Sequence, residues 1–280
     1  MSVSKTQIDR LGDRLKQGPH TESDLRLLDD YRRSFGEACE TVVRTIRELG
    51  EAPTARLAKS TLSIVEKLCR ESIRLSQMQD IAGCRVVVKD IVQQDRFVET
   101  LRTAFRAASV IDRRENPSYG YRAVHIIAEI AGKAVEIQVR SSLQHLWAEL
   151  SEKSSDVLDP TIKYGGGSHE WRTFLIKSSK AVASYERFEK LHFDAVASTD
   201  VARVAHGKFR KAVAELLEYH PPDHAVQELQ EKLEDSTRNM EHLEKRKEES
   251  QAELVRLRKV NTDLLSGALS RLDDLKRQEQ

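Results

Sequence analysis

Apolar and polar side chains alternate strictly over residues 135–140 of the segment AVEIQVR, 134–140, and this pattern constrains the fold more than any other stretch of the chain. Successive side chains of a β-strand point to opposite faces. One face of this strand therefore carries only apolar residues, and the other aligns Glu136, Gln138 and Arg140. The apolar face predicts contact with a core. Taken alone, the polar face is best explained as an ordinary solvated sheet face.

The flanking segments predict a mixed sheet covered by helices. Residues 121–130 form a second alternating strand, and the short glycine-containing link Ala131-Gly132-Lys133 predicts a hairpin between the two. Further strands are expected at 84–90 and 108–112. Apolar residues at three- and four-residue spacing predict one helix that ends at Gly50 and Pro53, and others at about 59–68, 93–106, 142–153, 169–191 and 198–219. The fold class is therefore α/β (α+β).

The segment after Pro221-Pro222 has a different pattern. Leucines and other apolar residues fall on a seven-residue frame there, and polar residues such as Asn261 interrupt it. A polar residue in such a seam can fix register and partner number. The pattern predicts either a coiled coil that joins a second copy or another protein, or a helical hairpin that folds back on the protein.

Charge and hydropathy exclude several classes of function. The chain has 280 residues, 46 basic and 45 acidic, with a net charge of +1, so it lacks the basic surface expected of a protein that binds duplex DNA. No apolar run approaches the roughly 20 residues that span a bilayer, and the N-terminus lacks a signal-peptide core. Three cysteines without C-x-x-C spacing suit a reducing compartment. We expect a cytoplasmic protein without membrane contact.

Candidate binding groups lie near the polar row. Tyr121 and His125 share one face of their strand, where an aromatic ring could stack on a base and an imidazole could contact phosphate or ribose. The preceding loop, 113–120, is polar and begins with Arg113 and Arg114, which suits closure over a phosphorylated acceptor.

A second group of charged residues combines positions before and within the strand at 84–90 with Glu136 of the polar row. Asp80 and Glu136 offer hard oxygen ligands to a magnesium ion bridging ATP phosphates. Lys59, Lys67 and Arg85 can neutralise the charge of those phosphates.

Five blocks of sequence, taken together, resemble the RelA/SpoT synthetase family, the (p)ppGpp synthetases or alarmone pyrophosphokinases. The blocks are RLAKSTLSIVEK at 56–67, QDIAGCRVVV at 79–88, YGYRAVH at 119–125, VEIQVRSSLQHLWAEL at 135–150 and KY at 163–164. The resemblance is to the small alarmone synthetase type, which includes toxins. It implies a nucleotidyltransferase-like mixed sheet and a magnesium-dependent transfer of the β,γ-pyrophosphate of ATP to the ribose 3′-hydroxyl of GDP or GTP.

The resemblance also implies a role for each matching residue. Asp80 would hold Mg²⁺, and Glu136 would assist the metal or accept the proton of the attacking hydroxyl. The expected ATP-binding residues are Arg56, Lys59, Ser63, Lys67 and Arg85. On the acceptor side, Tyr121 would stack on the base, and the remaining contacts would come from His125, Gln138 and Arg140.

The chain departs from the family pattern at two places. Arg56 stands three positions before Lys59, where the family's basic residue often stands two before. Many members carry a Glu-His pair after the Trp-Ala-Glu motif, and this chain has Ser151-Glu152-Lys153. No His-Asp dipeptide occurs, so a paired alarmone hydrolase is not expected.

Alternative acceptors are the 3′ end of tRNA, as in a translation-inhibiting toxin with an antitoxin, and adenine nucleotides. A further alternative is a non-catalytic nucleotide-binding module that signals through its tail. The predicted organisation is an N-terminal helical segment packed on the core at 1–50, a synthetase core at 51–167, a helical C-terminal part of the catalytic domain at 168–220, and the coiled-coil or hairpin tail at 223–280.

Overall fold

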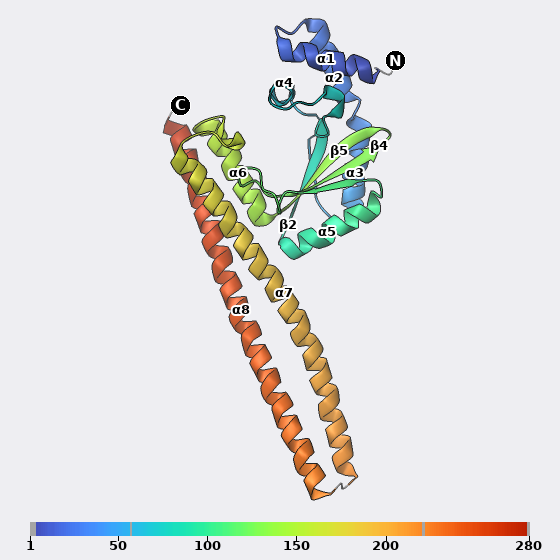
Figure 1. Ribbon diagram of the computed structural model, residues 1–280, viewed down its shortest axis with the longest axis vertical. Helices are drawn as coiled ribbons and strands as arrows, with labels where there is room; N and C mark the ends of the chain where they lie inside the picture. The colour runs from blue at the N-terminus through green and yellow to red at the C-terminus, as the bar shows by residue number, and fades with distance from the viewer. Residues whose placement is uncertain (1–3, 57, 220–221, 279–280) are drawn as a thin grey trace. The chain divides into compact units, whose positions relative to one another are not determined.

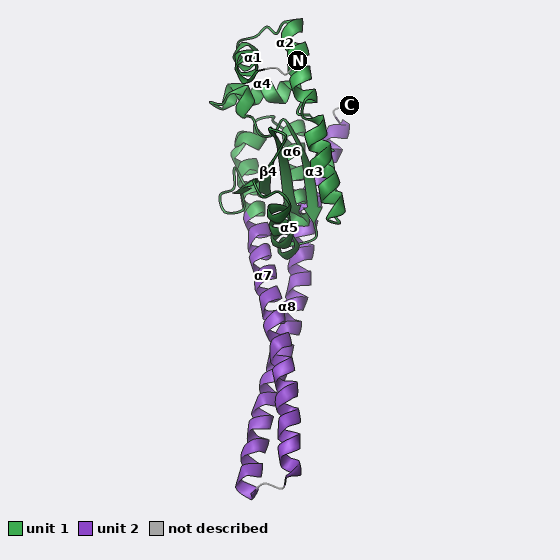
Figure 2. Cartoon of the chain, turned by 90° about the vertical axis from the view of Figure 1, so that its right-hand side faces the viewer, with its two compact units in different colours: residues 1–179 green, residues 180–280 purple. Residues whose placement is uncertain are grey.

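The computed structural model describes residues 4–56, 58–219 and 222–278. The chain divides into two compact units, Met1–Ser179 and Lys180–Gln280 (Figure 2). Pro221, at the start of the expected tail, lies outside the described residues. None of the helices in the described ranges has the length and apolarity that a membrane span requires.

The first unit is built around a five-stranded mixed sheet with the order β1-β2-β5-β4-β3 (Figure 1). Strands β2 and β5 are parallel, and the other neighbours are antiparallel. The strands are β1 (Thr54–Arg56), β2 (Ala82–Val88), β3 (Ser109–Asp112), β4 (Val124–Ile130) and β5 (Lys133–Ser141). The sheet and its flanking helices confirm the predicted fold class.

Alternation along β5 separates the two faces of the sheet as the sequence predicts. Val135, Ile137 and Val139 are fully buried and join the main hydrophobic core. Helices α3 (Gly36–Glu48) and α5 (Ile91–Ala104) pack against the sheet, and their apolar residues enter the same core. Burial of this apolar surface fixes the register of β5 and leaves its polar side chains on the opposite face.

The hairpin between β4 and β5 is confirmed. Ile130 pairs with Lys133 across a two-residue turn. Ala131 and Gly132 both have positive φ, at 49° and 72°. A two-residue turn with both central residues in this region suits the twist of antiparallel strands.

The N-terminal region differs from its prediction as a single helix that ends at Gly50 and Pro53. It contains α2 (Glu22–Arg33) and α3, separated at Ser34 and Phe35. The Ser34 hydroxyl donates to the carbonyl oxygen of Tyr31 at 2.6 Å, and such a bond competes with continued helical bonding. Phe35 is buried in the core. Helix α1 (Lys5–Gln17) packs on α2 and α4 (Thr61–Arg70).

Two long helices follow α6 (Ser142–Val157): α7 (His169–Glu218) and α8 (Asp223–Gln278). The predicted interruption of α7 between 191 and 198 is wrong, because that stretch contains no glycine or proline and continues as helix. Contacts between α7 and α8 pair His192 with Ser250 at 2.7 Å and His206 with Ser236 at 2.8 Å. The second unit is therefore an antiparallel helical hairpin of α7 and α8, in which the segment expected as the tail forms one continuous helix paired with α7.

Candidate active site

The polar face of the sheet brings the predicted residues of three strands together. Parallel pairing sets Gly83 of β2 beside Glu136 and Arg85 beside Gln138. Antiparallel pairing sets His125 of β4 on the other side of Gln138. Because paired residues present their side chains on the same face, this register gathers a carboxylate, an amide, an imidazole and a guanidinium.

Five side chains on this side of the sheet form a closed ring of hydrogen bonds. His125 Nδ1 lies 2.7 Å from Glu136 Oε1, and His125 Nε2 lies 2.9 Å from the Tyr121 hydroxyl. Arg140 Nη2 donates to that hydroxyl and to Gln138 Oε1, both at 3.0 Å. Gln138 Nε2 donates to Glu136 Oε2 at 2.7 Å and completes the ring. Such a network fixes the rotamers of its members before any ligand binds.

Tyr121 lies outside the strand in which the sequence places it. Strand β4 begins at Val124, and Tyr121 forms an isolated bridge with Ser118 instead. Its ring meets His125 edge to face at 5.7 Å, and the Arg140 guanidinium lies 5.1 Å from the ring centroid. The phenol is therefore a fixed part of the ring of hydrogen bonds.

Arg140 carries a positive charge that forms no ion pair with the described residues. The residue is only 2% exposed, and its Nε and Nη1 atoms lack a hydrogen-bond partner among the described residues. Burial, followed by the nearby charge of Arg140, lowers the pKa of Arg85. Buried guanidinium nitrogens without partners are costly, and an anionic ligand can satisfy them.

Asp80 lies just before β2 and is held by two lysines. Lys59 Nζ lies 2.7 Å from Oδ2, and Lys67 Nζ lies 3.0 Å from Oδ1. Arg56 Nη2 donates to the Asp80 carbonyl oxygen at 3.4 Å. Burial raises the pKa of Asp80, but the hydrogen bonds and charges of the two lysines outweigh it and leave the pKa below its ordinary value. Asp80 is therefore a carboxylate at neutral pH.

Glu136 is also held as a carboxylate. Burial raises its pKa. The hydrogen bond and charge of His125, together with the hydrogen bond from Gln138, lower the pKa by more than burial raises it, so the net shift is downward. The charge of Asp80 opposes this shift, which places the two carboxylates within electrostatic reach of each other. A carboxylate with a lowered pKa suits binding of a cation better than equilibrium proton abstraction near pH 7.

A small cavity of ≈ 140 Å³ opens beside this row. It is lined by Thr54, Ala55, Arg56, Gly83, Cys84, Arg85, Glu136 and Gln138. A β-carbon on Gly83 would collide with the backbone carbonyl oxygen of Glu136. Glycine at this position therefore permits the close approach of β2 to β5 on which the cavity floor depends.

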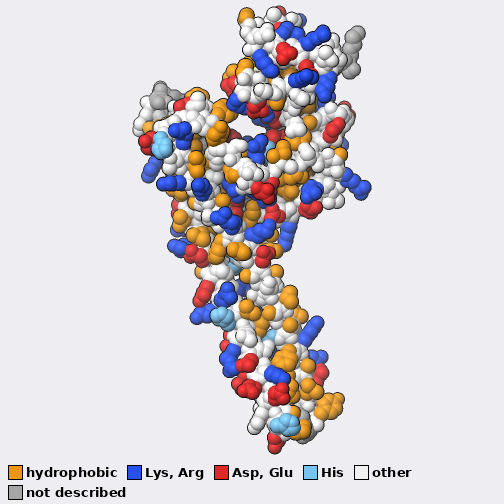
Figure 3. Space-filling model, viewed as in Figure 1, with side chains coloured by type: hydrophobic (Ala, Val, Ile, Leu, Met, Phe, Trp, Pro, Cys, Tyr) orange, Lys and Arg blue, Asp and Glu red, His pale blue; other side chains and the backbone are white. Residues whose placement is uncertain are grey.

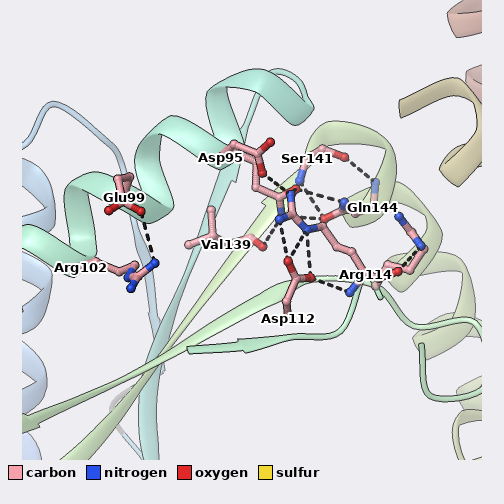
Figure 4. Close-up of polar contacts among 10 residues, drawn as sticks. Asp95, Glu99, Arg102, Asp112, Arg114, Val139, Ser141 and Gln144 are labelled. Carbon is pink, nitrogen blue, oxygen red and sulfur yellow. Dashed lines mark hydrogen bonds and ion pairs between the residues drawn. The ribbon is translucent and has the colours of Figure 1, made fainter. Parts of the chain in front are cut away.

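Arg114 lies in a different network, although the sequence groups it with the acceptor-binding residues (Figure 4). Its guanidinium contacts both carboxylate oxygens of Asp112, Asp95 at 2.7 Å and Gln94 at 3.2 Å. Two carboxylates satisfy the charge, so nothing in this geometry supports a role for Arg114 in binding the acceptor. Arg113 remains in the loop, where its Nη1 donates to Ser118 Oγ at 3.0 Å.

Ser63 lies in the first turn of α4, away from the ring of hydrogen bonds. Ser60 caps that helix by accepting from the Ser63 backbone NH at 3.2 Å, and its hydroxyl donates to Ser63 Oγ at 2.8 Å. The serine hydroxyl is therefore on the same segment as Lys59 and Lys67.

Sequence reasoning missed the contribution of α6. His145 and Glu149 lie 3.4 Å apart, and Glu152 lies 3.6 Å from Arg85. The charges of Arg85 and Arg140, after burial, lower the pKa of His145, whereas Glu149 raises it. The spacing of 145, 149 and 152 marks one face of a helix, and this signal was available in the sequence.

Comparisons with known proteins match this part of the chain. Residues 56–155 match the family model described as the region found in RelA / SpoT proteins. Uncharacterized proteins of Mycobacterium bovis and Mycobacterium tuberculosis are 36% identical over 111 residues, which cover 38% of this chain and 41% of each relative. The match thus spans about two fifths of the length of these curated relatives.

Two solved structures of the small alarmone synthetase 1 from Bacillus subtilis are also similar. The form bound to its product pppGpp is 23% identical with a TM-score of 0.46, and another is 26% identical with a TM-score of 0.45. Each match covers 64% of this chain and 100% of that chain. The family match falls on the strands and helices that build the candidate site. Residues 56–155 of this chain therefore form a RelA/SpoT domain.

Proposed function

We propose that the RelA/SpoT domain transfers the β,γ-pyrophosphate of ATP to the ribose 3′-hydroxyl of GDP or GTP. The observation that carries the proposal is the buried Arg140, which forms no ion pair with the described residues and belongs to one hydrogen-bonded ring with the Glu136 carboxylate. Phosphoryl chemistry needs positioning and charge stabilisation more than covalent help from the protein. This face of the sheet offers both.

Positive groups surround the place proposed for the phosphates. Lys59 and Lys67 each contact one oxygen of Asp80, and Arg85 and Arg140 belong to the neighbouring strands β2 and β5. In the proposed reaction the 3′-hydroxyl oxygen attacks the β-phosphorus, the bond from that phosphorus to the oxygen of the α-phosphate breaks, AMP leaves, and the hydroxyl proton is released to solvent. The guanidinium and ammonium groups would stabilise the negative charge that develops on the phosphate oxygens.

The residues present fit magnesium. Asp80 and Glu136 supply hard oxygen donors, and the described residues contain no group of three or more metal-binding side chains. Magnesium in phosphoryl-transfer sites is commonly held by one or two carboxylates and by substrate phosphates. Asp80 and Glu136 would hold the ion, which when bound neutralises phosphate charge.

Tyr121 and His125 would serve the acceptor. Hydrogen bonds with His125 and Arg140 hold the Tyr121 hydroxyl in place. A base or ribose can therefore contact the aromatic ring of Tyr121 without displacing a mobile side chain. Because the pKa of Glu136 is lowered, we assign Glu136 to cation binding and to orienting His125. Arg56 and Ser63 would complete the ATP side, and Arg113 would contact the acceptor.

A transfer assay tests the proposal. ATP labelled on the γ-phosphate is incubated with Mg²⁺ and, in parallel, with GDP, GTP, ATP and deacylated tRNA. Asp80→Ala and Glu136→Gln should abolish transfer, whereas Glu129→Gln, which changes an exposed carboxylate on the same sheet, should not. Label on tRNA alone would replace the proposed acceptor by the tRNA 3′ end and indicate a translation-inhibiting toxin. ATP binding without transfer to any acceptor would favour a non-catalytic nucleotide-binding module.

We also propose that the helical hairpin binds a second copy of the chain. Several apolar side chains of α7 point to solvent, among them Val201 at 71% and Val204 at 60% exposure. Figure 3 shows hydrophobic side chains exposed along the lower part of the hairpin. Light scattering of the protein and of a Val201→Glu/Val204→Glu variant tests this. A dimer that the variant abolishes supports the proposal, and a monomeric parent protein contradicts it.

A further inference from the structure

We propose that Lys59 and Lys67 occupy Asp80 in the nucleotide-free protein and exchange it for the phosphates of ATP, so that Asp80 accepts a divalent cation only once the nucleotide is bound. The exchange rests on the proposed function, because it assumes that ATP phosphates bind at these lysines. It adds an order of binding that the proposed function does not require.

The first observation is that both oxygens of Asp80 are taken. Each oxygen has its own ammonium partner, Lys59 at 2.7 Å and Lys67 at 3.0 Å. The side chain of Asp80 is 13% exposed and that of Lys59 is 12% exposed. A divalent cation that approached Asp80 would meet two ammonium groups at hydrogen-bond distance, and at this degree of burial their repulsion is poorly screened.

The second observation is that the two lysines come from different parts of one segment. Lys59 precedes α4, and its backbone NH donates to the Ile81 carbonyl oxygen at 2.6 Å. Lys67 lies in α4, where its ammonium also lies 3.9 Å from Glu71. This backbone hydrogen bond holds Lys59 beside the start of β2, while its flexible side chain can turn to another anion.

The third observation is the contrast with Glu136. Its two oxygens accept from an imidazole and an amide, His125 and Gln138. Neither partner is a lysine or arginine. Only Asp80 is therefore blocked by ammonium groups, although both carboxylates lie within electrostatic reach of each other.

These contacts make phosphate and Asp80 competitors for the same two ammonium groups. Without a divalent cation, the lysines must leave Asp80 before they can bind ATP, and Asp80 then repels the phosphates. With the cation present, it takes the place of the lysines on Asp80 and removes that penalty. Binding of cation and nucleotide is then coupled, and the coupling is reciprocal.

The decisive experiment measures ATP binding in EDTA by isothermal titration calorimetry. Asp80→Asn should bind metal-free ATP roughly tenfold more tightly than the parent protein, since the lysines are no longer held by a carboxylate. Glu136→Gln removes the same charge from the neighbouring carboxylate and serves as the matched control. It should give a much smaller gain, because Glu136 holds no lysine.

A double-mutant cycle separates the exchange from a general loss of negative charge. In a Lys59→Met/Lys67→Met background, Asp80→Asn should no longer improve ATP binding. The same background should bind Mn²⁺ without nucleotide, as measured by electron paramagnetic resonance, whereas the parent protein should not. Circular dichroism at 222 nm checks that each variant is folded.

An equal gain from Asp80→Asn and Glu136→Gln would overturn the exchange, and so would Mn²⁺ binding at Asp80 in the nucleotide-free parent protein. ATP binding with the predicted coupling but without pyrophosphate transfer would refute the proposed function and leave the exchange standing. Absence of ATP binding in every variant would refute both.

Discussion

Two arginines of the first unit show how the protein separates architecture from ligand binding. Arg114 and Arg140 both belong to networks of polar side chains and both lie close to the end of β5. Arg114 contacts the carboxylates of Asp112 and Asp95. Arg140 contacts only a phenol and an amide, and two of its nitrogens have no partner among the described residues.

The hydrogen bonds of the Arg114 network are complete, whereas those of the Arg140 network are not. Buried polar groups in folded proteins are nearly always satisfied, so a saturated guanidinium is explained by the fold itself. A buried guanidinium without a counter-ion destabilises the folded protein. That cost is offset where a bound ligand supplies the negative charge. By this criterion Arg114 supports the fold and Arg140 receives an anion.

The Arg114 network also explains why Arg140 is held in place. Gln94 is fully buried and donates to the Val139 carbonyl oxygen at 2.7 Å and to Gln144 at 2.8 Å. Gln144 in turn belongs to the capping box of α6. The saturated network thus ties α5 and α6 to the strand residue next to Arg140.

Of the two arginines, Arg140 should have the larger effect on transfer when it is replaced. Arg140→Met should lower kcat/KM by about 10²- to 10³-fold, because it removes charge stabilisation from the developing phosphate charge. The melting temperature should change little or rise, since an unpaired buried charge is removed. Steady-state kinetics and differential scanning calorimetry check both values. A large drop in melting temperature with unchanged transfer would reverse the assignment of the two arginines.

Replacement of Arg114 should have its main effect on stability. Arg114→Met leaves two carboxylates without their partner and should lower the free energy of unfolding by about 3 kcal/mol. Arg114→Lys should recover only part of this, because lysine cannot form the two-pronged contact with Asp112. Urea denaturation measures the loss. Transfer activity per folded molecule should fall far less than in Arg140→Met, and an equal fall would contradict the distinction.

The sequence predicts the polar row of β5 but not this distinction. Alternation over residues 135–140 gives the face of Glu136, Gln138 and Arg140 directly, because strand periodicity is a local property. The partners of Arg114 are different. Asp112 is two residues away, but Asp95 comes from α5, and only the packing of that helix on the sheet brings the two together.

Tyr121 and the long helices show the same limit. The apolar pattern of 121–130 extends β4 too far, because it does not reveal that Tyr121 turns back to pair with Ser118. The seven-residue spacing of apolar residues in the tail predicts a helix with one apolar face. The spacing does not identify the helix that packs against that face. Pairing of His206 with Ser236 shows that a helix of the same chain packs there.

Anion binding should distinguish the two arginines with a smaller effect. Tripolyphosphate at about ten times its dissociation constant should stabilise the parent protein by about 1.4 kcal/mol. Arg114→Lys should retain this increment in thermal unfolding, and Arg140→Met should lose most of it. If only Arg114→Lys lost the stabilisation by tripolyphosphate, the anion would bind at Arg114 and the assignment of Arg140 would be contradicted.

Acid should weaken the Arg114 network by the smallest of these amounts. Burial raises the pKa of Asp112, but the hydrogen bonds from Arg114 outweigh it, so the folded pKa lies below the ordinary value of 3.8. The unfolded chain then binds the proton first as the pH falls. The contribution of this pair to stability is fully present well above pH 3.8 and is lost as the pH falls through that value toward the folded pKa.

The difference in unfolding free energy between the parent protein and Arg114→Met should therefore shrink by about 1 kcal/mol between pH 6 and pH 3. Urea denaturation across this range measures the difference directly, and the comparison cancels the titration of the carboxylates that Arg114 does not contact. Arg140→Met should show no such shrinkage, because Arg140 contacts no carboxylate among the described residues. A difference for Arg114→Met that stays constant with pH would mean that the contacts of Arg114 stabilise the fold by packing alone.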